Sequence, residues 1–468
     1  MRTSLRLLVA LALALAVAGM RPASAADDPY GNLQWNLSQI HAPAAWPVST
    51  GAGVKIGIVD SGVNRNHEDL VGKVVAAATC VGTSGNVDKC TGGTNPGPND
   101  GNDINGHGTH VAGIAAAVTG NGTGVAGVAP DAKLIVARAF APSSDGSEPT
   151  ANLDDVKAAI EWVVAQGAQI VNLSVGVESS GVCLLCGSNT SNPLGPVVEE
   201  AWQRGALPVI ASGNNNQQLF GGASGGYSKL DAIVVGATAP DGSVEPYSSA
   251  IGSAKWGIVA PGGDAADPQG LCNQQSPSCG MVLSTYAGTG CKPTDAPNCY
   301  AYLAGTSMAT PHVSGVAALL FAHGLSRQEV VDTLLATADP MDCGTNCAGR
   351  LNASRALGAV PNDTGGGSGS GSGSHTTTTV KKSTSSSGGG SKAATTTTPT
   401  TSPFTFNKEH PSGPSTTFRR PQGAIVLRST PADSNGVPVL VGLAGIVSLA
   451  GAALAMSYNL RRTLTTLP

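Results

Sequence analysis

An α/β fold with a mostly parallel central sheet is the fold class that the sequence predicts. Short apolar runs recur along residues 31–360, and segments with apolar residues at helical spacing lie between them. Strands that alternate with helices favour a parallel sheet that helices cover on both faces. The predicted strands span Val54–Val59, Leu134–Ala139, Ile170–Leu173, Pro208–Ala211 and Ile233–Gly236. The predicted helices span Leu153–Gln166 and Val197–Arg204.

The first 25 residues have the pattern of an export signal. Arg2 and Arg6 precede the apolar run Leu7–Ala18, and residues 23–25 read Ala-Ser-Ala, a small-residue cleavage pattern. The apolar run is too short to span a bilayer comfortably, which disfavours an N-terminal membrane anchor. We therefore expect a signal peptide over residues 1–25 and an exported folded domain over residues 26–360.

The ten cysteines fall into five pairs that are close in sequence, as expected of disulfides in an exported protein. The pairs are Cys80/Cys90, Cys183/Cys186, Cys272/Cys279, Cys291/Cys299 and Cys343/Cys347. A redox motif at Cys183/Cys186 is the alternative for one pair, but the thioredoxin-like context is missing. The formal net charge of −4 gives no reason to expect a nucleic-acid partner, which needs a basic patch.

The C-terminal part of the chain has a different composition. Residues 361–436 are rich in Gly, Ser, Thr and Pro and cannot bury enough apolar surface to fold, which predicts a disordered linker. Residues 437–458 carry no charge and are long enough to cross a hydrocarbon core of ~30 Å, which predicts one transmembrane helix. The export signal then places residues 459–468 in the cytoplasm and the folded domain outside the cell membrane.

Two segments carry polar residues typical of a catalytic site. Asp60 ends an apolar strand, where open α/β sheets place their sites. His107 lies between two glycines at the start of an Ala-rich helical run. A zinc site at His107 and His110 is the alternative, but zincins need a Glu after the first His and a four-residue spacing.

A third segment, residues 305–313, reads Gly-Thr-Ser-Met-Ala-Thr-Pro-His-Val and leads into an apolar helix. Its Ser307 is either a helix cap or a nucleophile, since helix amides stabilise developing negative charge. A serine hydroxyl needs a base to take its proton and a carboxylate to orient that base. The order Asp, His, Ser and the Ala at position 309 exclude the α/β-hydrolase pattern.

Together the three segments resemble the subtilisin-like serine proteases over about residues 27–358. The strings that carry this resemblance are Gly-His-Gly-Thr-His-Val-Ala-Gly and Gly-Thr-Ser-Met-Ala-Thr-Pro-His-Val. The resemblance implies a three-layer fold and a triad in which Ser307 attacks the peptide carbonyl, His107 transfers the proton and Asp60 orients His107. It also implies that Asn214, in Ser212-Gly213-Asn214, donates to the oxyanion. Ser174, Val175 and Gly176 are similar to the family's substrate-binding strand, which pairs with the peptide backbone.

A structural Ca²⁺ site is also implied by this resemblance, through ligand positions similar to those of thermitase. Asp28, Asp69 and Asn121 are expected to give side-chain oxygens, and Val118, Thr123 and Val125 to give carbonyl oxygens. Hard oxygen donors on a flexible loop suit Ca²⁺. An acidic N-terminus beside an ordinary Gly-rich turn is the alternative.

The predicted function is that of a membrane-anchored serine endopeptidase acting on proteins or peptides outside the cell. The order of signal, protease domain, linker and membrane helix is similar to that of the mycosins of type VII secretion. This leaves a processing protease or structural partner of a secretion system as one alternative, and a non-catalytic surface binding module as another. The complete triad with Asn214 favours an enzyme.

Overall fold

The computed structural model describes residues 28–142, 150–178, 193–214, 230–266, 272, 278–288 and 298–359, and the strands 426–428 and 440–442. The chain divides into two units, residues 1–361 with 419–468 and residues 362–418. The second unit lies outside the described residues, as do the predicted signal peptide, the predicted tail and the rest of the predicted linker except Val426–Arg428.

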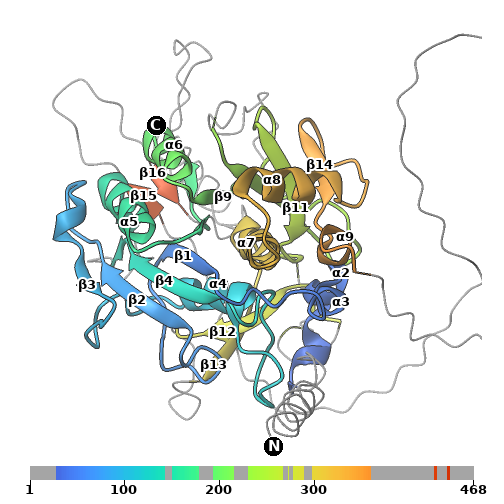
Figure 1. The fold of residues 1–468 in the computed structure, drawn as a ribbon, viewed down its shortest axis with the longest axis horizontal. Helices are drawn as coiled ribbons and strands as arrows, with labels where there is room; N and C mark the ends of the chain where they lie inside the picture. Colours follow the sequence, from blue (N-terminus) through green and yellow to red (C-terminus); the bar gives the residue numbers. More distant parts are fainter. Residues whose placement is uncertain are drawn as a thin grey trace, which may run out of the picture. The chain divides into compact units, whose positions relative to one another are not determined.

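A nine-stranded sheet forms the centre of the first unit (Figure 1). Its order is β14-β11-β10-β9-β7-β1-β4-β2-β3, and every neighbouring pair is parallel except β2 with β3. The strands are β1 (Lys55–Asp60), β2 (Val74–Thr79), β3 (Thr91–Gly93), β4 (Lys133–Arg138), β7 (Ile170–Leu173), β9 (Leu207–Ala211), β10 (Ile233–Thr238), β11 (Trp256–Pro261) and β14 (Cys347–Arg350). The prediction of a mostly parallel sheet is confirmed.

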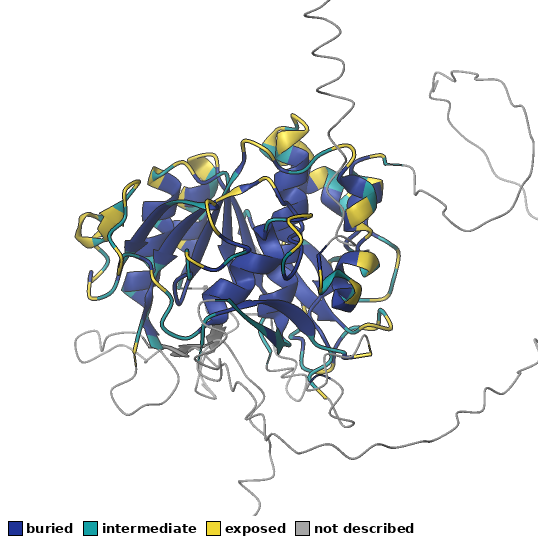
Figure 2. Ribbon diagram, turned by 90° about the horizontal axis from the view of Figure 1, so that it is seen from below, coloured by how far each residue is buried: buried dark blue, intermediate teal, exposed yellow. Residues whose placement is uncertain are grey.

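Helices cover both faces of this sheet. The longer ones are α4 (His107–Ala116), α5 (Leu153–Ala165), α6 (Gly195–Gln203), α7 (Thr306–Ala322) and α8 (Arg327–Ala336). The short ones are η2 (Gly31–Leu33), α2 (Trp35–Gln39), α3 (Ala42–Ala45), η3 (Val87–Lys89) and α9 (Ala353–Ala356). Two cores result: α4 and α7 pack on one face, and α5 and α6 pack on the other. Figure 2 shows the sheet buried between these helices.

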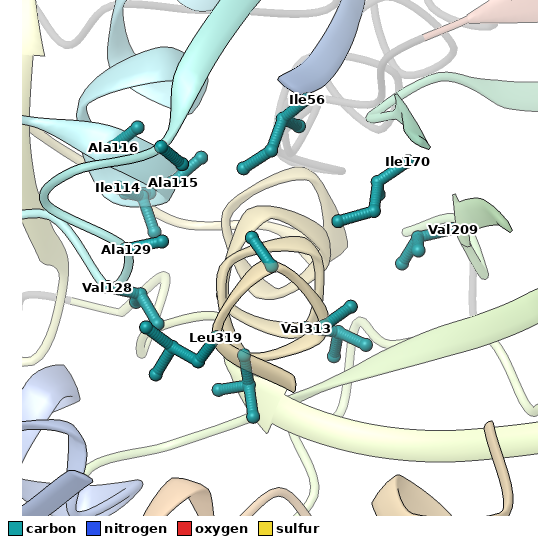
Figure 3. Packing of buried hydrophobic residues seen from close by; sticks show 14 of the residues in the cluster. Ile56, Ile114, Ala115, Ala116, Val128, Ala129, Ile170, Val209, Val313 and Leu319 are labelled. Atoms are coloured by element: carbon teal, nitrogen blue, oxygen red, sulfur yellow. The ribbon is translucent and has the colours of Figure 1, made fainter. Parts of the chain in front are cut away.

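The alternation of side chains along β1 explains how one strand serves both cores. Ile56 and Ile58 point to the core that contains α7, and Val59 points to the core that contains α5. Figure 3 shows Ile56, Ile170 and Val209, from three neighbouring strands, lying around α7. Every residue of α7 from Thr306 to Leu320 is buried, as expected of a helix that is apolar on all sides. This helix therefore starts inside the protein, at the edge where β1 ends.

Two smaller sheets complete the described structure. Strands β12 (Val282–Tyr286) and β13 (Cys299–Leu303) form an antiparallel hairpin. The five-stranded sheet has the order β5-β6-β15-β16-β8. Its strands are β5 (Phe140–Ala141), β6 (Thr150–Asn152), β8 (Gly176–Glu178), β15 (Val426–Arg428) and β16 (Leu440–Gly442).

Strand β16 differs from the prediction, because its three residues belong to the segment 437–458 that was predicted to be a transmembrane helix. Leu440–Gly442 instead pairs antiparallel with β8 and with β15, since its apolar residues fit a strand as well as a helix. Likewise, β15 lies in the predicted linker. Within the described ranges, no helix is long and apolar enough to cross a membrane.

Three of the five predicted disulfides are confirmed. Cys80 bonds to Cys90, Cys272 to Cys279, and Cys343 to Cys347. Cys299 is also disulfide-bonded. The predicted pair Cys183/Cys186 and the predicted partner Cys291 lie outside the described residues.

Candidate active site

Asp60 and His107 form a buried pair at the carboxyl edge of the central sheet. Asp60 is the last residue of β1, and His107 is the first residue of α4. The imidazole Nδ1 lies 2.8 Å from Asp60 Oδ1 and 3.0 Å from Oδ2. Asp60 is fully buried and His107 is 4% exposed. Because Nδ1 donates to the carboxylate, the other nitrogen, Nε2, is the one that can accept a proton.

A glycine lets the strand and the helix approach each other. A Cβ atom at Gly108 would lie 2.1 Å from the carbonyl oxygen of Gly62 and 3.1 Å from Asp60 Cβ. No real side chain fits there, so Gly108 is the residue that allows the start of α4 to contact the turn after β1. This contact brings the His107 ring within hydrogen-bonding distance of Asp60.

Ser307 lies in the first turn of α7 and is 4% exposed. Its Oγ donates to the carbonyl oxygen of Ser174 at 3.2 Å. Its own carbonyl oxygen accepts from Ser174 Oγ at 2.9 Å. That carbonyl is available because Pro311, four residues later, has no N–H to donate to it. Pro311 therefore leaves the Ser307 carbonyl free to bind Ser174, in the segment predicted to bind substrate.

Asn214 follows β9 and contacts the residue before Ser307. Its Oδ1 accepts from Thr306 N at 2.9 Å and from Thr306 Oγ1 at 2.8 Å. These two bonds fix the orientation of the amide, so Nδ2 is its donating end. Of the two residues before it, Gly213 donates its N–H to Thr306 Oγ1 at 3.2 Å, and Ser212 donates its N–H to Val235 O at 2.9 Å.

The predicted substrate-binding residues lie beside this group. Ser174 and Val175 are buried, and Ser174 Oγ accepts from Asn172 Nδ2 at 2.9 Å while it donates to Ser307. Gly176 opens β8, whose edge pairs with β16. That these residues bind a peptide substrate stays a prediction.

The six predicted calcium ligands come together at the loop that follows α4. Asp28 accepts from Gly120 N at 2.8 Å and from Gly122 N at 3.2 Å. Asp69 accepts from Asn121 Nδ2 at 3.0 Å, Thr123 Oγ1 at 2.9 Å and Val125 N at 2.8 Å, and its carbonyl oxygen accepts from Val118 N at 2.9 Å. Among the described residues, no cluster of three or more His, Cys, Asp or Glu side chains could hold a metal, so any ion here depends on amide and carbonyl oxygens as well.

Asp28 lies in surroundings that disfavour its charged form. Burial raises the pKa of Asp28, and the nearby charge of Asp69 raises it further. A divalent ion between the two carboxylates would offset both effects. The arrangement departs from the prediction at Asn121, whose Oδ1 accepts from Thr123 N while Nδ2 faces Asp69. Coordination through Oδ1 therefore requires this amide to turn.

The zinc alternative finds no support at His110. Its Nε2 lies 3.0 Å from Ala301 O and 3.2 Å from Val282 O, both backbone acceptors. Burial lowers the pKa of His110 to about 3, so the ring is neutral and Nε2 carries the proton that these carbonyls accept. His110 thus holds the β12–β13 hairpin against α4.

Several supporting residues were not predicted from the sequence. Ser61, Asp103, Thr306 and Tyr300 hydrogen-bond to the predicted site residues or to the segments that carry them. Tyr300 OH lies 2.9 Å from Asp69 Oδ2 and 2.8 Å from Glu68 Oε1. Asp103 lies three residues before Gly106, the N-cap of α4, so the preference for Asp at N-caps does not identify it from the sequence.

Comparison with known proteins shows the family to which the chain belongs. It matches the model of the Subtilase family over residues 51–394. It is 35% identical to thermitase from Thermoactinomyces vulgaris over 336 residues, which are 71% of this chain and 98% of thermitase. It is 33% identical to a thermophilic serine proteinase from a Bacillus strain over 340 residues, which are 71% of this chain and 68% of that protein.

A solved structure agrees with this match. A protease from Pseudoalteromonas arctica superposes with a TM-score of 0.55 at 26% identity, covering 72% of this chain and 99% of that one. The fold and these relatives define the class: the chain is a serine endopeptidase. Within that class it belongs to the subtilase family, because the family model matches most of the chain.

Proposed function

We propose that this endopeptidase hydrolyses peptide bonds through Asp60, His107 and Ser307. The observation that carries the proposal is the buried hydrogen bond from His107 Nδ1 to Asp60, at 2.8 Å, on the edge of the sheet where α7 begins. This bond fixes the tautomer that leaves Nε2 unprotonated, as a general base requires.

The proposed chemistry follows from these groups. Ser307 Oγ turns from the Ser174 carbonyl toward His107, loses its proton to Nε2 and attacks the peptide carbonyl carbon. Asn214 Nδ2 and the Ser307 amide donate to the oxyanion that forms. His107 then gives the proton to the leaving amine, and an acyl-enzyme remains on Ser307. Water activated by His107 hydrolyses that ester and restores the serine.

Ser307→Ala tests this assignment. It removes one oxygen, so the variant should fold with a thermal midpoint near that of the wild type and lose proteolysis. A serine-directed fluorophosphonate should label Ser307 in the wild type, as peptide mapping by mass spectrometry would show. Label on another serine, or proteolysis that survives in the variant, contradicts the triad.

We also infer a structural Ca²⁺ ion at Asp28, Asp69, Asn121 and the carbonyls of residues 118, 123 and 125. The support is the convergence of these residues and the raised pKa of Asp28 beside Asp69. The ion would supply charge neutralisation between two carboxylates that otherwise repel each other. It has no part in the chemical steps above.

We further propose that the protein is exported and held at the cell membrane with its catalytic domain outside. This rests on the sequence of residues 1–25 and 437–458, which lie outside the described residues apart from Leu440–Gly442. The similarity to mycosins, and a secretion-system partner with it, stays a prediction that rests on the same segments. The family membership favours an enzyme over the non-catalytic binding module.

A further inference from the structure

One carboxylate near the proposed triad accepts an unusual number of hydrogen bonds. Asp103 lies four residues before His107 and has two carboxylate oxygens, with about four lone-pair positions between them. Its donors are Ser61 Oγ at 2.8 Å, Asn105 N at 3.0 Å, Gly106 N at 2.9 Å, Thr109 N at 2.9 Å and Thr109 Oγ1. The acceptor capacity of Asp103 is therefore filled.

These donors belong to two different parts of the active site. Ser61 is in the turn after β1, and its N–H donates to Asp60 Oδ1 at 2.7 Å. Its Oγ donates to Asp103 and accepts from Gly108 N at 2.9 Å. One hydroxyl thus joins the Asp60 turn, the helix that carries His107, and the carboxylate of Asp103.

The other donors belong to the start of α4. Gly106 is the N-cap of this helix and has no side chain to cap it, and its φ of 106° lies in the left-handed region. Asp103 replaces the missing cap by accepting from Gly106 N and from Thr109 N, the third amide of the helix. A negative charge at this position also interacts favourably with the helix dipole. The backbone of His107 thus lies between Gly106 N and Thr109 N, which both donate to the Asp103 carboxylate.

We propose that Asp103 is a positioning residue that sets the distance between Asp60 and His107. The inference rests on the proposed triad. Asp60 and His107 are on separate elements, so their hydrogen bonds of 2.8 and 3.0 Å require the end of β1 and the start of α4 to be held together. Asp103 is bonded to both, through Ser61 on one side and Gly106 and Thr109 on the other. A misplacement of a catalytic group by about 1 Å costs on the order of 10²-fold in rate.

Asp103→Asn tests the proposal. Asn keeps one acceptor oxygen and replaces the other with an NH₂ group. This group faces the same hydrogen-bond donors but cannot accept from them. We expect kcat on a chromogenic peptide to fall by about 10–100-fold, with KM within about twofold of the wild type and a native circular dichroism spectrum. Asp155→Asn is the matched control, because Asp155 is a buried carboxylate that accepts from Gly82 N, Thr83 N and Thr83 Oγ1 but touches no part of the site. Its kcat should stay within about twofold at a similar loss of thermal midpoint.

A double mutant separates positioning from general destabilisation. Residues that act through one catalytic group are not additive, so Asp103→Asn should cause no further loss of residual activity in a His107→Ala background. A further loss there, or a kcat within twofold of the wild type in the single variant, overturns the proposal. A wrong assignment of the triad gives a different result, because His107→Ala and Ser307→Ala would then keep wild-type proteolysis.

Ser61→Ala covers the case in which Asp103→Asn does not fold. It removes only the hydroxyl bridge and keeps the amide bond from residue 61 to Asp60 and the other four donors to Asp103. We expect a modestly lower thermal midpoint, because the buried Gly108 N loses its acceptor, and a kcat reduced about 3–10-fold, because the two elements lose one of their links. A wild-type kcat in this variant also overturns the proposal.

Discussion

Asn214 shows how much a single side chain in this site depends on its neighbour. The two bonds from Thr306 to its Oδ1 fix which side of the amide carries the donor Nδ2. Asn214→Leu should lower kcat by about 10²–10³-fold with little change in KM, because an oxyanion donor acts mainly in the transition state. Steady-state kinetics on a peptide substrate provide the measurement.

Thr306→Val is the graded control for this prediction. It keeps the backbone bond from residue 306 to Asn214 Oδ1 and the whole Asn214 amide, and it removes the hydroxyl that donates to Oδ1 and accepts from Gly213 N. Its loss in kcat should therefore be smaller than that of Asn214→Leu. If Asn214→Leu raises KM and leaves kcat unchanged, Asn214 binds the substrate rather than the oxyanion.

Glu245, which lies outside the proposed triad, lowers the stability of the folded protein at alkaline pH. Burial, together with the charges of Asp264 and Asp241, raises its pKa to about 7. A carboxyl whose pKa is higher in the folded state loses stability for that state as pH rises through 7. Glu245→Gln should therefore raise the thermal midpoint at pH 8, on the order of 2 °C, and leave it unchanged at pH 4.5.

Scanning calorimetry at both pH values measures this effect. Glu329→Gln is a suitable control, because hydrogen bonds from Ser326 lower the pKa of Glu329 and removing that charge should give no gain at pH 8. A midpoint of Glu245→Gln that is raised equally at pH 4.5 would point to packing instead of ionisation.

Single residues were predicted from the sequence only where a motif specified them. Asp60, His107 and Ser307 stand in short strings of unusual composition, and the structure places Asp60 beside His107. Asp103 and Thr306 could not be assigned roles in this way. Their functions depend on hydrogen bonds to Ser61 and Asn214, which are 42 and 92 residues distant in the chain.

At the scale of elements, the calcium loop makes a testable contribution to stability. A ligand that binds only the folded state stabilises it by about 2.7 kcal/mol at a concentration of 100 Kd. Calcium should therefore raise the thermal midpoint of the wild type, and Asp69→Ala should remove most of that rise because it deletes the carboxylate that the loop surrounds. Calorimetry with calcium or with chelator measures both.

Asp100→Ala is the control for this experiment, since Asp100 accepts only a local bond from Gly97 N, apart from the loop. It should keep the full calcium response. A wild-type midpoint that is the same in chelator and in calcium would mean that no ion binds at Asp69.

The elements that the sequence predicted are those with one dominant signal. The five predicted strands and two predicted helices are present with ends within two residues of the structure. The predicted strands do not include β2, β3, β11 and β14 of the central sheet. Weak local signals explain β2, which is rich in Ala, and β14, four residues of Cys, Ala, Gly and Arg that have no strong strand preference. Both pair along the main chain with stronger neighbours, β4 and β11. Their strand structure comes from tertiary contacts that local propensity does not contain.

At the scale of the whole molecule, the described catalytic domain contains every residue proposed for catalysis and for calcium. All ten cysteines also precede position 361. The Gly-, Ser- and Thr-rich segment that follows is predicted from its composition to be a disordered linker, although its residues Val426–Arg428 pair with β6. We therefore predict that residues 26–360 perform the chemistry and that the C-terminal segment sets the location of the protein.

A variant that ends at Pro361 tests this separation. It should be released into the medium and cleave a small peptide with the kcat of the full chain, while the full chain should sediment with membranes. Added protease should release an active domain from the full chain by cutting the predicted linker.

The matched control keeps the linker and replaces only residues 437–458 with a polar segment of equal length, which separates loss of the apolar span from loss of the linker. A shortened form that stays with the membrane, or one that is released but inactive, would show that the C-terminal segment does more than anchor. Because β16 pairs with β8, which follows Ser174 in the chain, a released but inactive variant would indicate that activity depends on this pairing.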